Sequence, residues 1–173
     1  GGIENFICCE GNSMHIIDYH SGEVIHIFPG DNKSRVGKKK GHTGVITCAF
    51  YDGADRKAYT GSVDEHVICW DTENKKMIRS YEGHEGAITA IAVEGNVMAT
   101  GSADVTIRLW DKAKGTCSRI VHGHSKSVLS LELGSDWMVT ASADEEIRLW
   151  NIYHKSKHSI ACDSLTRLIG HEV

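Results

Sequence analysis

The sequence predicts an all-β protein built as a stack of small antiparallel sheets. Three observations lead to this prediction. One segment recurs with a period of forty residues, each period holds four short runs of β-forming residues, and the 173-residue chain has a single proline. Gly, Asn and Asp separate the runs, as expected for strands joined by tight turns.

The repeat is defined by three similar segments of eleven residues, at 61–71, 101–111 and 141–151. Each contains Ser, Asp and Trp at the same places, so that successive tryptophans stand 40 residues apart. A Gly-His pair precedes each segment, and a fourth pair stands near the end of the chain; these pairs are at 41–42, 83–84, 123–124 and 170–171. A period near forty with these landmarks is a specific repeat signature.

Four strands are expected in each period. The first follows Gly-His, as at 87–93, and the second is β-rich, as at 137–140. The third is the run that ends in Trp, as at 107–110, and the fourth is more polar, as at 76–81. The first three are apolar at nearly every position, which indicates sheets covered on both faces. The polar fourth strand suits an outer edge.

These residues resemble the WD-repeat (Trp-Asp repeat) β-propeller family over nearly the whole chain. The resemblance implies four-stranded antiparallel blades arranged in a ring around a central channel. The chain holds a partial set, one incomplete blade and three complete blades. Because such rings usually close with about seven blades, we expect the remaining blades to come from the same parent chain or from a second copy.

The period divides the chain into five parts. The first forty residues resemble a degenerate repeat in which Ile17 stands where the others have Trp, and 6–9, 14–17 and 24–28 correspond to its second, third and fourth strands. The expected parts are a partial repeat with a basic loop at 1–40, complete repeats at 41–82 and 83–122, a repeat with an insertion at 123–169, and the start of a further repeat at 170–173.

The resemblance gives the repeated polar residues a structural bracing role. It implies that each Asp accepts a hydrogen bond from the His of the preceding loop, and that this His is linked to the Ser and to the Trp indole. The residues concerned are His42, Ser62, Asp64 and Trp70 in the first complete repeat, His84, Ser102, Asp104 and Trp110 in the second, and His124, Ser142, Asp144 and Trp150 in the third.

The same Ser, His and Asp residues are also the ingredients of a hydrolase triad, which is judged by geometry and not by chain order. Three copies at one period favour bracing, because a catalytic site is normally assembled once. The chain has no Walker loop and no G-x-G-x-x-G motif, and the histidines outside the Gly-His pairs lack metal-ligand spacing. We therefore expect a protein that is not an enzyme and has no metal or cofactor.

Partner-contact positions are also implied by the resemblance, at two places in each blade near one mouth of the channel. They lie just inside the first strand and just before the turn Asp. Their small, uncharged side chains favour an apolar or small partner side chain over a phosphorylated peptide, for which Arg is expected. An alternative is that some belong to the core. The six positions are Thr47, Val63, Thr89, Ala103, Leu129 and Ala143.

Composition narrows the class of partner and the compartment. A net charge of -4 and a pI near 6.3 argue against broad nucleic-acid binding, and no apolar run is long enough to span a membrane. The six cysteines are irregularly spaced, which favours free thiols and an intracellular, cytoplasmic location. The basic run at 33–40 is either a solvated loop or a contact for an acidic partner or membrane surface. A second insertion, within 153–164, is polar.

Three functions remain open at this point. The first is a non-catalytic protein–protein interaction scaffold that binds a protein or peptide at the channel mouth. The second is a substrate-recognition or regulatory module of a multi-subunit enzyme, such as a ubiquitin ligase or kinase assembly. The third, a hydrolase that uses His84, Ser102 and Asp104, is disfavoured by the threefold repetition.

Overall fold

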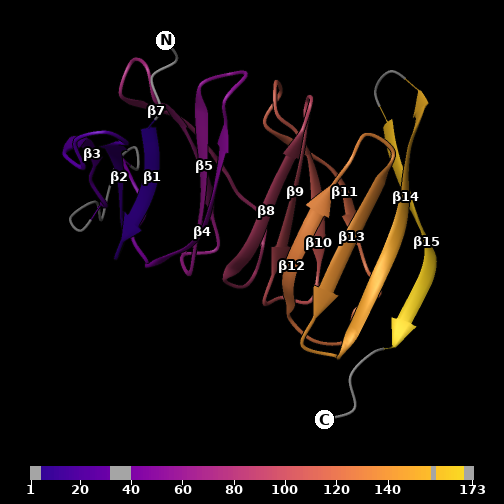
Figure 1. The fold of residues 1–173 in the computed structure, drawn as a ribbon. Helices are drawn as coiled ribbons and strands as arrows, with labels where there is room; N and C mark the ends of the chain where they lie inside the picture. The colour runs from indigo at the N-terminus through magenta and orange to yellow at the C-terminus, as the bar shows by residue number, and fades with distance from the viewer. Residues whose placement is uncertain (1–4, 32–39, 157–158, 170–173) are drawn as a thin grey trace.

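The chain folds into four antiparallel β-sheets that stand side by side (Figure 1). The structure, a computed structural model, describes residues 5–31, 40–156 and 159–169, and the side chains within 6–31 and 40–152. Every regular element in these ranges is a strand. This confirms the all-β class and the small antiparallel sheets predicted from the repeat.

The first sheet has three strands and the other three sheets have four, always in chain order. The first sheet comprises β1 (Asn5–Glu10), β2 (Ser13–Asp18) and β3 (Val24–Phe28). The second comprises β4 (Ile46–Asp52), β5 (Lys57–Ser62), β6 (Val67–Asp71) and β7 (Lys76–Tyr81). The third comprises β8 (Ile88–Glu94), β9 (Val97–Ser102), β10 (Ile107–Asp111) and β11 (Thr116–Val121). The fourth comprises β12 (Val128–Leu133), β13 (Trp137–Ser142), β14 (Glu146–Ser156) and β15 (Ser159–Ile169).

The polar insertion expected within 153–164 lengthens the last hairpin. β14 and β15 have 11 residues each, against 5 and 6 for the corresponding β10 and β11. The two strands stay paired beyond the blade, with Tyr153 opposite Ala161. Most of the basic run predicted at 33–40 lies outside the described residues.

The second and third sheets each bury one face against the sheet before and the other face against the sheet after, whereas the first and fourth sheets each have one such neighbour. We call the face towards the sheet before the N-side face and the other the C-side face. In the second sheet the N-side face carries Ala58, Ile68 and Trp70, which pack with residues of the first sheet. Its C-side face carries Tyr59 and Val67, which pack with the third sheet. This two-sided burial explains why the strands are apolar at nearly every position.

The third and fourth sheets meet in the same way. Leu109 of β10 and Met138 of β13 are both fully buried in the cluster between these two sheets. Burying one such side chain contributes ~1.5–3 kcal/mol relative to leaving it exposed. The fold is therefore stabilised mainly at the contacts between successive sheets.

Two glycines allow the second strand of one sheet to approach the first strand of the next sheet closely. A Cβ at Gly61 would lie 2.5 Å from Ile88 Cγ2, and one at Gly101 would lie 2.7 Å from Val128 Cγ1. Both distances are too short for non-bonded carbons, so the close approach requires glycine. In the fourth sheet the corresponding position, opposite Ser130 in the register, is occupied by Ala141.

Candidate functional site

The repeated polar residues gather at the same end of the second, third and fourth sheets. Each His lies in the loop before the first strand of its sheet, and each Asp lies in the turn between the second and third strands. A backbone hydrogen bond closes each turn, for example from the Val105 N–H to the Ser102 carbonyl at 3.3 Å. The residue after each Asp adopts a positive φ of 70° or 71°. The repeat thus places three similar turns beside three similar loops.

A relay of four side chains connects the core of each sheet to this turn. In the third sheet the Trp110 Nε1 lies 2.9 Å from Thr100 Oγ1, which lies 2.8 Å from His84 Nε2. The His84 Nδ1 lies 2.7 Å from the Asp104 carboxylate. The second and fourth sheets repeat the relay with Trp70, Thr60, His42 and Asp64, and with Trp150, Thr140, His124 and Asp144.

One arrangement of protons satisfies every contact of the relay with a neutral imidazole. The Trp indole can only donate, and an ionised Asp can only accept. The His Nδ1–H therefore donates to Asp, and the Nε2 accepts from the Thr hydroxyl, whose oxygen in turn accepts the Trp N–H. The three threonines are completely buried, so a relay hydrogen bond left unmade would lower the stability of the fold.

The Asp carboxylates are held in the ionised form. Burial opposes the charge of Asp104, but the Thr106 hydroxyl, the Glu85 N–H and the His84 ring donate to it and lower its pKa to about 2. Asp144 likewise has a pKa of about 2, since the Ser125 N–H and His124 outweigh its burial. Burial lowers the pKa of His84 despite the adjacent carboxylate, which agrees with the neutral imidazole of the relay.

The structure corrects the predicted role of serine. The side chain that meets the imidazole is threonine, at Thr60, Thr100 and Thr140, and not Ser62, Ser102 or Ser142. Each serine oxygen instead accepts the backbone N–H of the Asp two residues later, at 3.0–3.1 Å. Serine therefore stabilises the turn, whereas threonine links His to Trp.

This geometry does not suit a hydrolase. A triad needs a reactive hydroxyl that contacts the imidazole and can reach substrate. The hydroxyl that contacts His84 Nε2 belongs to Thr100, which is 0% exposed and also accepts the Trp110 N–H. The arrangement matches a buried hydrogen-bond network and lacks an accessible nucleophile in its described atoms.

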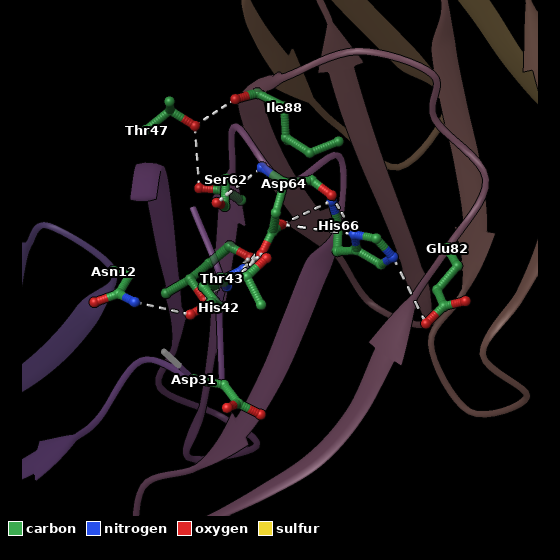
Figure 2. Close-up of polar contacts among 12 residues, drawn as sticks. Asn12, Asp31, His42, Thr43, Thr47, Ser62, Asp64, His66, Glu82 and Ile88 are labelled. Carbon is green, nitrogen blue, oxygen red and sulfur yellow. Dashed lines mark hydrogen bonds and ion pairs between the residues drawn. The ribbon is translucent and has the colours of Figure 1, made fainter. Parts of the chain in front are cut away.

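The residue two positions after each Asp distinguishes the three turns. In the second sheet it is His66, whose Nε2 lies 3.7 Å from a Glu82 carboxylate oxygen (Figure 2). In the fourth it is Glu146, which lies with His124 and Asp144 close enough for a metal ion, within 4.8 Å. The Glu146 carboxylate is paired with Arg148 at 2.8 Å, and the His124 Nδ1 is paired with Asp144. These existing pairs account for the cluster without a metal.

The six predicted contact positions lie together at this end of the sheets. Thr47, Thr89 and Leu129 each occupy the bulge near the start of the first strand, where the register shifts by one residue. Val63, Ala103 and Ala143 each follow the second strand directly. None of the six is buried, and Val63 and Leu129 are 48% and 55% exposed.

Two contacts were not anticipated from the sequence. The Thr47 hydroxyl donates to the Ile88 carbonyl of the next sheet (Figure 2), and the Thr89 hydroxyl donates to the Val128 carbonyl. These two threonines therefore join successive sheets. Val45 is also 55% exposed beside Val63, whose N–H donates to the Val45 carbonyl at 3.0 Å.

The comparisons with curated proteins agree with the repeat. The chain is 35% identical over 75 residues to Mitochondrial division protein 1 of Pyricularia oryzae, which covers 43% of this chain and 11% of the relative. It is 36% identical over 75 residues to WD repeat and FYVE domain-containing protein 2 of Caenorhabditis briggsae, which covers 42% of this chain and 18% of the relative. The chain thus spans a small part of the length of these relatives.

The solved structures extend the likeness to the whole fold. The chain superimposes with a TM-score of 0.77 on the structure of U3-55K, at 20% identity, and on the crystal structure of the RRP9 WD40 repeats, at 19% identity. Each superposition covers 91% of this chain and 47% of the other. Across the described residues, the structure contains no helix long and apolar enough to cross a membrane.

The family assignment follows from the repeats themselves. Residues 33–71, 75–111 and 115–151 match the family described as WD domain, G-beta repeat. The forty-residue period, the four-stranded sheets and the superposition on WD40 propellers point to the same family. The chain therefore belongs to the WD40 repeat family, whose propellers are generally non-catalytic and typically serve as scaffolds for protein–protein interaction.

Proposed function

We propose that this chain is a non-catalytic interaction scaffold that binds a protein or peptide partner at the channel mouth. The proposed contact surface, here called the rim, comprises Thr47, Val63, Thr89, Ala103, Leu129 and Ala143. The observation that supports it best is the exposure of Val63 and Leu129 at the same ends of different sheets. Apolar side chains that stay exposed in this way are suited to contact another protein.

The rim is held in place by the sheets beneath it. The Thr47 and Thr89 hydroxyls bond to the neighbouring sheet, and the relays anchor the adjoining turns to buried tryptophans. Such a surface loses little conformational freedom on binding, which favours affinity. The six rim positions carry no charge, so we expect a partner that presents an apolar or small side chain.

The rim is tested by a variant that changes exposed residues only. Val63→Glu combined with Leu129→Glu should abolish partner capture, because two carboxylates would be buried in an apolar contact. Neither side chain contributes to the core, so the melting temperature should stay within ~2 °C of wild type, as for other surface substitutions. The measurement is affinity capture with the immobilised chain, with captured proteins identified and quantified by mass spectrometry.

The control is Ile78→Glu, which places one such carboxylate on an exposed residue of the outer strand β7. It should retain the partners that the rim variant loses. Thr89 is unsuitable for this test because its hydroxyl also joins two sheets. Equal capture by the wild type and the rim variant would show that partners bind elsewhere.

We further propose that other blades of the same kind cover the two outermost faces, either from the parent chain or from a second copy. Ile147, on the C-side face of the fourth sheet, is 40% exposed, whereas the corresponding Val67 and Ile107 are 0% and 1% exposed. Phe6, on the N-side face of the first sheet, is 56% exposed, whereas the corresponding Ala58 is 0% exposed. The positions that successive sheets cover elsewhere are thus uncovered at both ends.

This second proposal predicts that the chain alone does not remain a stable monomer. Light scattering behind a sizing column should give about twice the 19.0 kDa of one chain, or a polydisperse sample if the missing blades belong to the parent chain. A monodisperse, folded species of 19.0 kDa would contradict the proposal.

A further inference from the structure

The loop before β4 carries an exposed threonine beside the Asp of the second sheet's relay. Residues 41–45 belong to no strand. The Thr43 N–H donates to the Asp64 Oδ2 at 2.8 Å, and the Thr43 hydroxyl lies 3.5 Å from the same oxygen (Figure 2). The preceding His42 is fully buried in the relay, whereas Thr43 is exposed. The Thr43 hydroxyl is therefore held at the surface by a well-defined loop.

Three consecutive lysines precede this threonine. They are Lys38, Lys39 and Lys40, at positions five, four and three before Thr43. No other Ser or Thr of the sequence has Lys or Arg at all three of these positions. Charge patterns of this kind are one means by which protein kinases select substrates. The sequence around Thr43 therefore fits a kinase whose substrate groove is acidic and prefers basic residues before the acceptor.

The third and fourth sheets offer two comparisons for this position. Glu85 and Ser125 occupy the corresponding place, and each donates its N–H to the Asp of its own relay. Glu85 shows that a negative charge here is compatible with a complete relay. Ser125 is exposed like Thr43, but none of the five residues before it is Lys or Arg. Ser125 thus matches Thr43 in place and exposure, and lacks the lysines.

Thr43 also lies beside the rim. The next residue, Gly44, approaches Val63 so closely that a Cβ at Gly44 would lie 2.6 Å from Val63 Cγ2. Val45 follows, is 55% exposed, and accepts the Val63 N–H at its carbonyl. A phosphate on Thr43 would carry a charge of about −1.5 to −2 at pH 7, and the ionised Asp64 would repel it. This charge would therefore stand next to the apolar part of the rim.

We propose that Thr43 is a phosphorylation site for a protein kinase that selects basic residues, and that its phosphate releases the partner from the rim. The first half stands on the loop alone, whereas the second rests on the proposed function. In the reaction, the bond between the terminal phosphorus of ATP and the ADP oxygen breaks and a bond from that phosphorus to Thr43 Oγ1 forms. The hydroxyl proton passes to a carboxylate of the kinase. The new charge then faces an apolar side chain of the partner, and burying it there is costly.

The first measurement is phosphorylation of the folded chain by a purified kinase with this basic preference, supplied with ATP and Mg²⁺. Mass spectrometry of peptides should place phosphate on Thr43 and none on Ser125. The variant with Lys38→Ala, Lys39→Ala and Lys40→Ala should incorporate phosphate on Thr43 at least tenfold more slowly. The site would be overturned by phosphate that enters Thr43 only in the urea-unfolded chain, or that enters Ser125 as fast as Thr43.

The second measurement compares capture of partners by the phosphorylated and the untreated chain. Phosphorylation should lower capture of the partners that require the rim at least tenfold. Thr43→Glu should lower it in the same direction, with a melting temperature within ~2 °C of wild type, as for other surface substitutions. The control is the kinase-treated Thr43→Ala chain, which should capture these partners as the untreated wild type does.

The rim variant separates the failure of this proposal from that of the proposed function. If the chain with Val63→Glu and Leu129→Glu loses the partners while the chain phosphorylated on Thr43 keeps them, the regulation is overturned and the proposed function stands. If both chains keep the partners, the proposed function fails, and the regulation fails with it.

Discussion

Replacing Thr100 by Val should lower the free energy of unfolding by about 3 kcal/mol. Valine has nearly the shape of threonine, so packing is preserved. The Trp110 N–H and the His84 Nε2 each lose their partner. A buried polar group left without a partner costs ~1–3 kcal/mol, and the substitution leaves two of them.

The measurement is unfolding in urea together with the melting temperature, which should fall by ~6–12 °C for a chain of this size. Thr116→Val is the matched control, since Thr116 is exposed at the start of β11, and it should change stability by less than ~0.5 kcal/mol. A double-mutant cycle with Trp110→Phe should be strongly non-additive. A loss of less than ~1 kcal/mol for Thr100→Val, below the cost of a single unsatisfied group, would show that the relay contributes little.

Replacing Lys112 by Met should also cost about 3 kcal/mol at pH 7, because it leaves a carboxylate without its buried partner. The Lys112 Nζ lies 2.6 Å from Asp52 of the preceding sheet and 2.8 Å from the Gly95 carbonyl. The side chains of Lys112 and Asp52 are only 6% and 14% exposed. This ion pair connects the second and third sheets at the end opposite the rim.

The cost should depend on pH in a defined direction. Burial raises the pKa of Asp52, but the Lys112 ammonium and the backbone N–H groups of Asp55 and Ala54 outweigh burial and lower it. A lowered carboxyl pKa contributes stability above the unfolded value of ~3.9 and loses it as the pH falls through the folded value. The variant lacks the Lys112 contribution, so its deficit should shrink as the pH falls below ~4.

Urea unfolding of wild type and Lys112→Met at pH 7 and at pH 3 measures this dependence. Lys114→Met is the control, since Lys114 pairs with Asp111 at 3.3 Å but is 55% exposed. It should cost less than ~0.5 kcal/mol at either pH. A deficit of the Lys112 variant that grows on acidification would contradict the assigned ion pair.

The repeat made the fold predictable, and the structure shows why. One forty-residue unit specifies four strands and a turn, so three copies give three similar sheets that bury each other's faces. The strands expected in the first forty residues, at 6–9, 14–17 and 24–28, lie within β1, β2 and β3. Local pattern and two-sided burial point to the same architecture.

The relay was only partly predictable. The sequence singled out His, Asp and Trp, but it assigned to serine the place that threonine occupies. Thr60, Thr100 and Thr140 recur at the same forty-residue period, ten residues before each Trp, and this signal was sufficient to find them. Serine and threonine have the same donor and acceptor groups, so only the geometry separates their roles.

Contacts between sheets could not be derived from the repeat. The Thr47 hydroxyl meets a carbonyl 41 residues away, and Lys112 meets a carboxylate 60 residues away. The Lys112 pair occurs once and forms no sequence pattern, and although Thr89 repeats the Thr47 contact, both contacts depend on how successive sheets are rotated and spaced.

The central claim is that each relay stabilises its own blade while the rim binds the partner. The most direct test places two variants in one capture experiment, at a temperature where both are folded. The Thr100→Val chain should melt ~6–12 °C lower yet capture the same partners as wild type. The chain with Val63→Glu and Leu129→Glu should melt as wild type does and capture none of them. The claim would be contradicted if the Thr100→Val chain lost the partners while the chain with Val63→Glu and Leu129→Glu kept them.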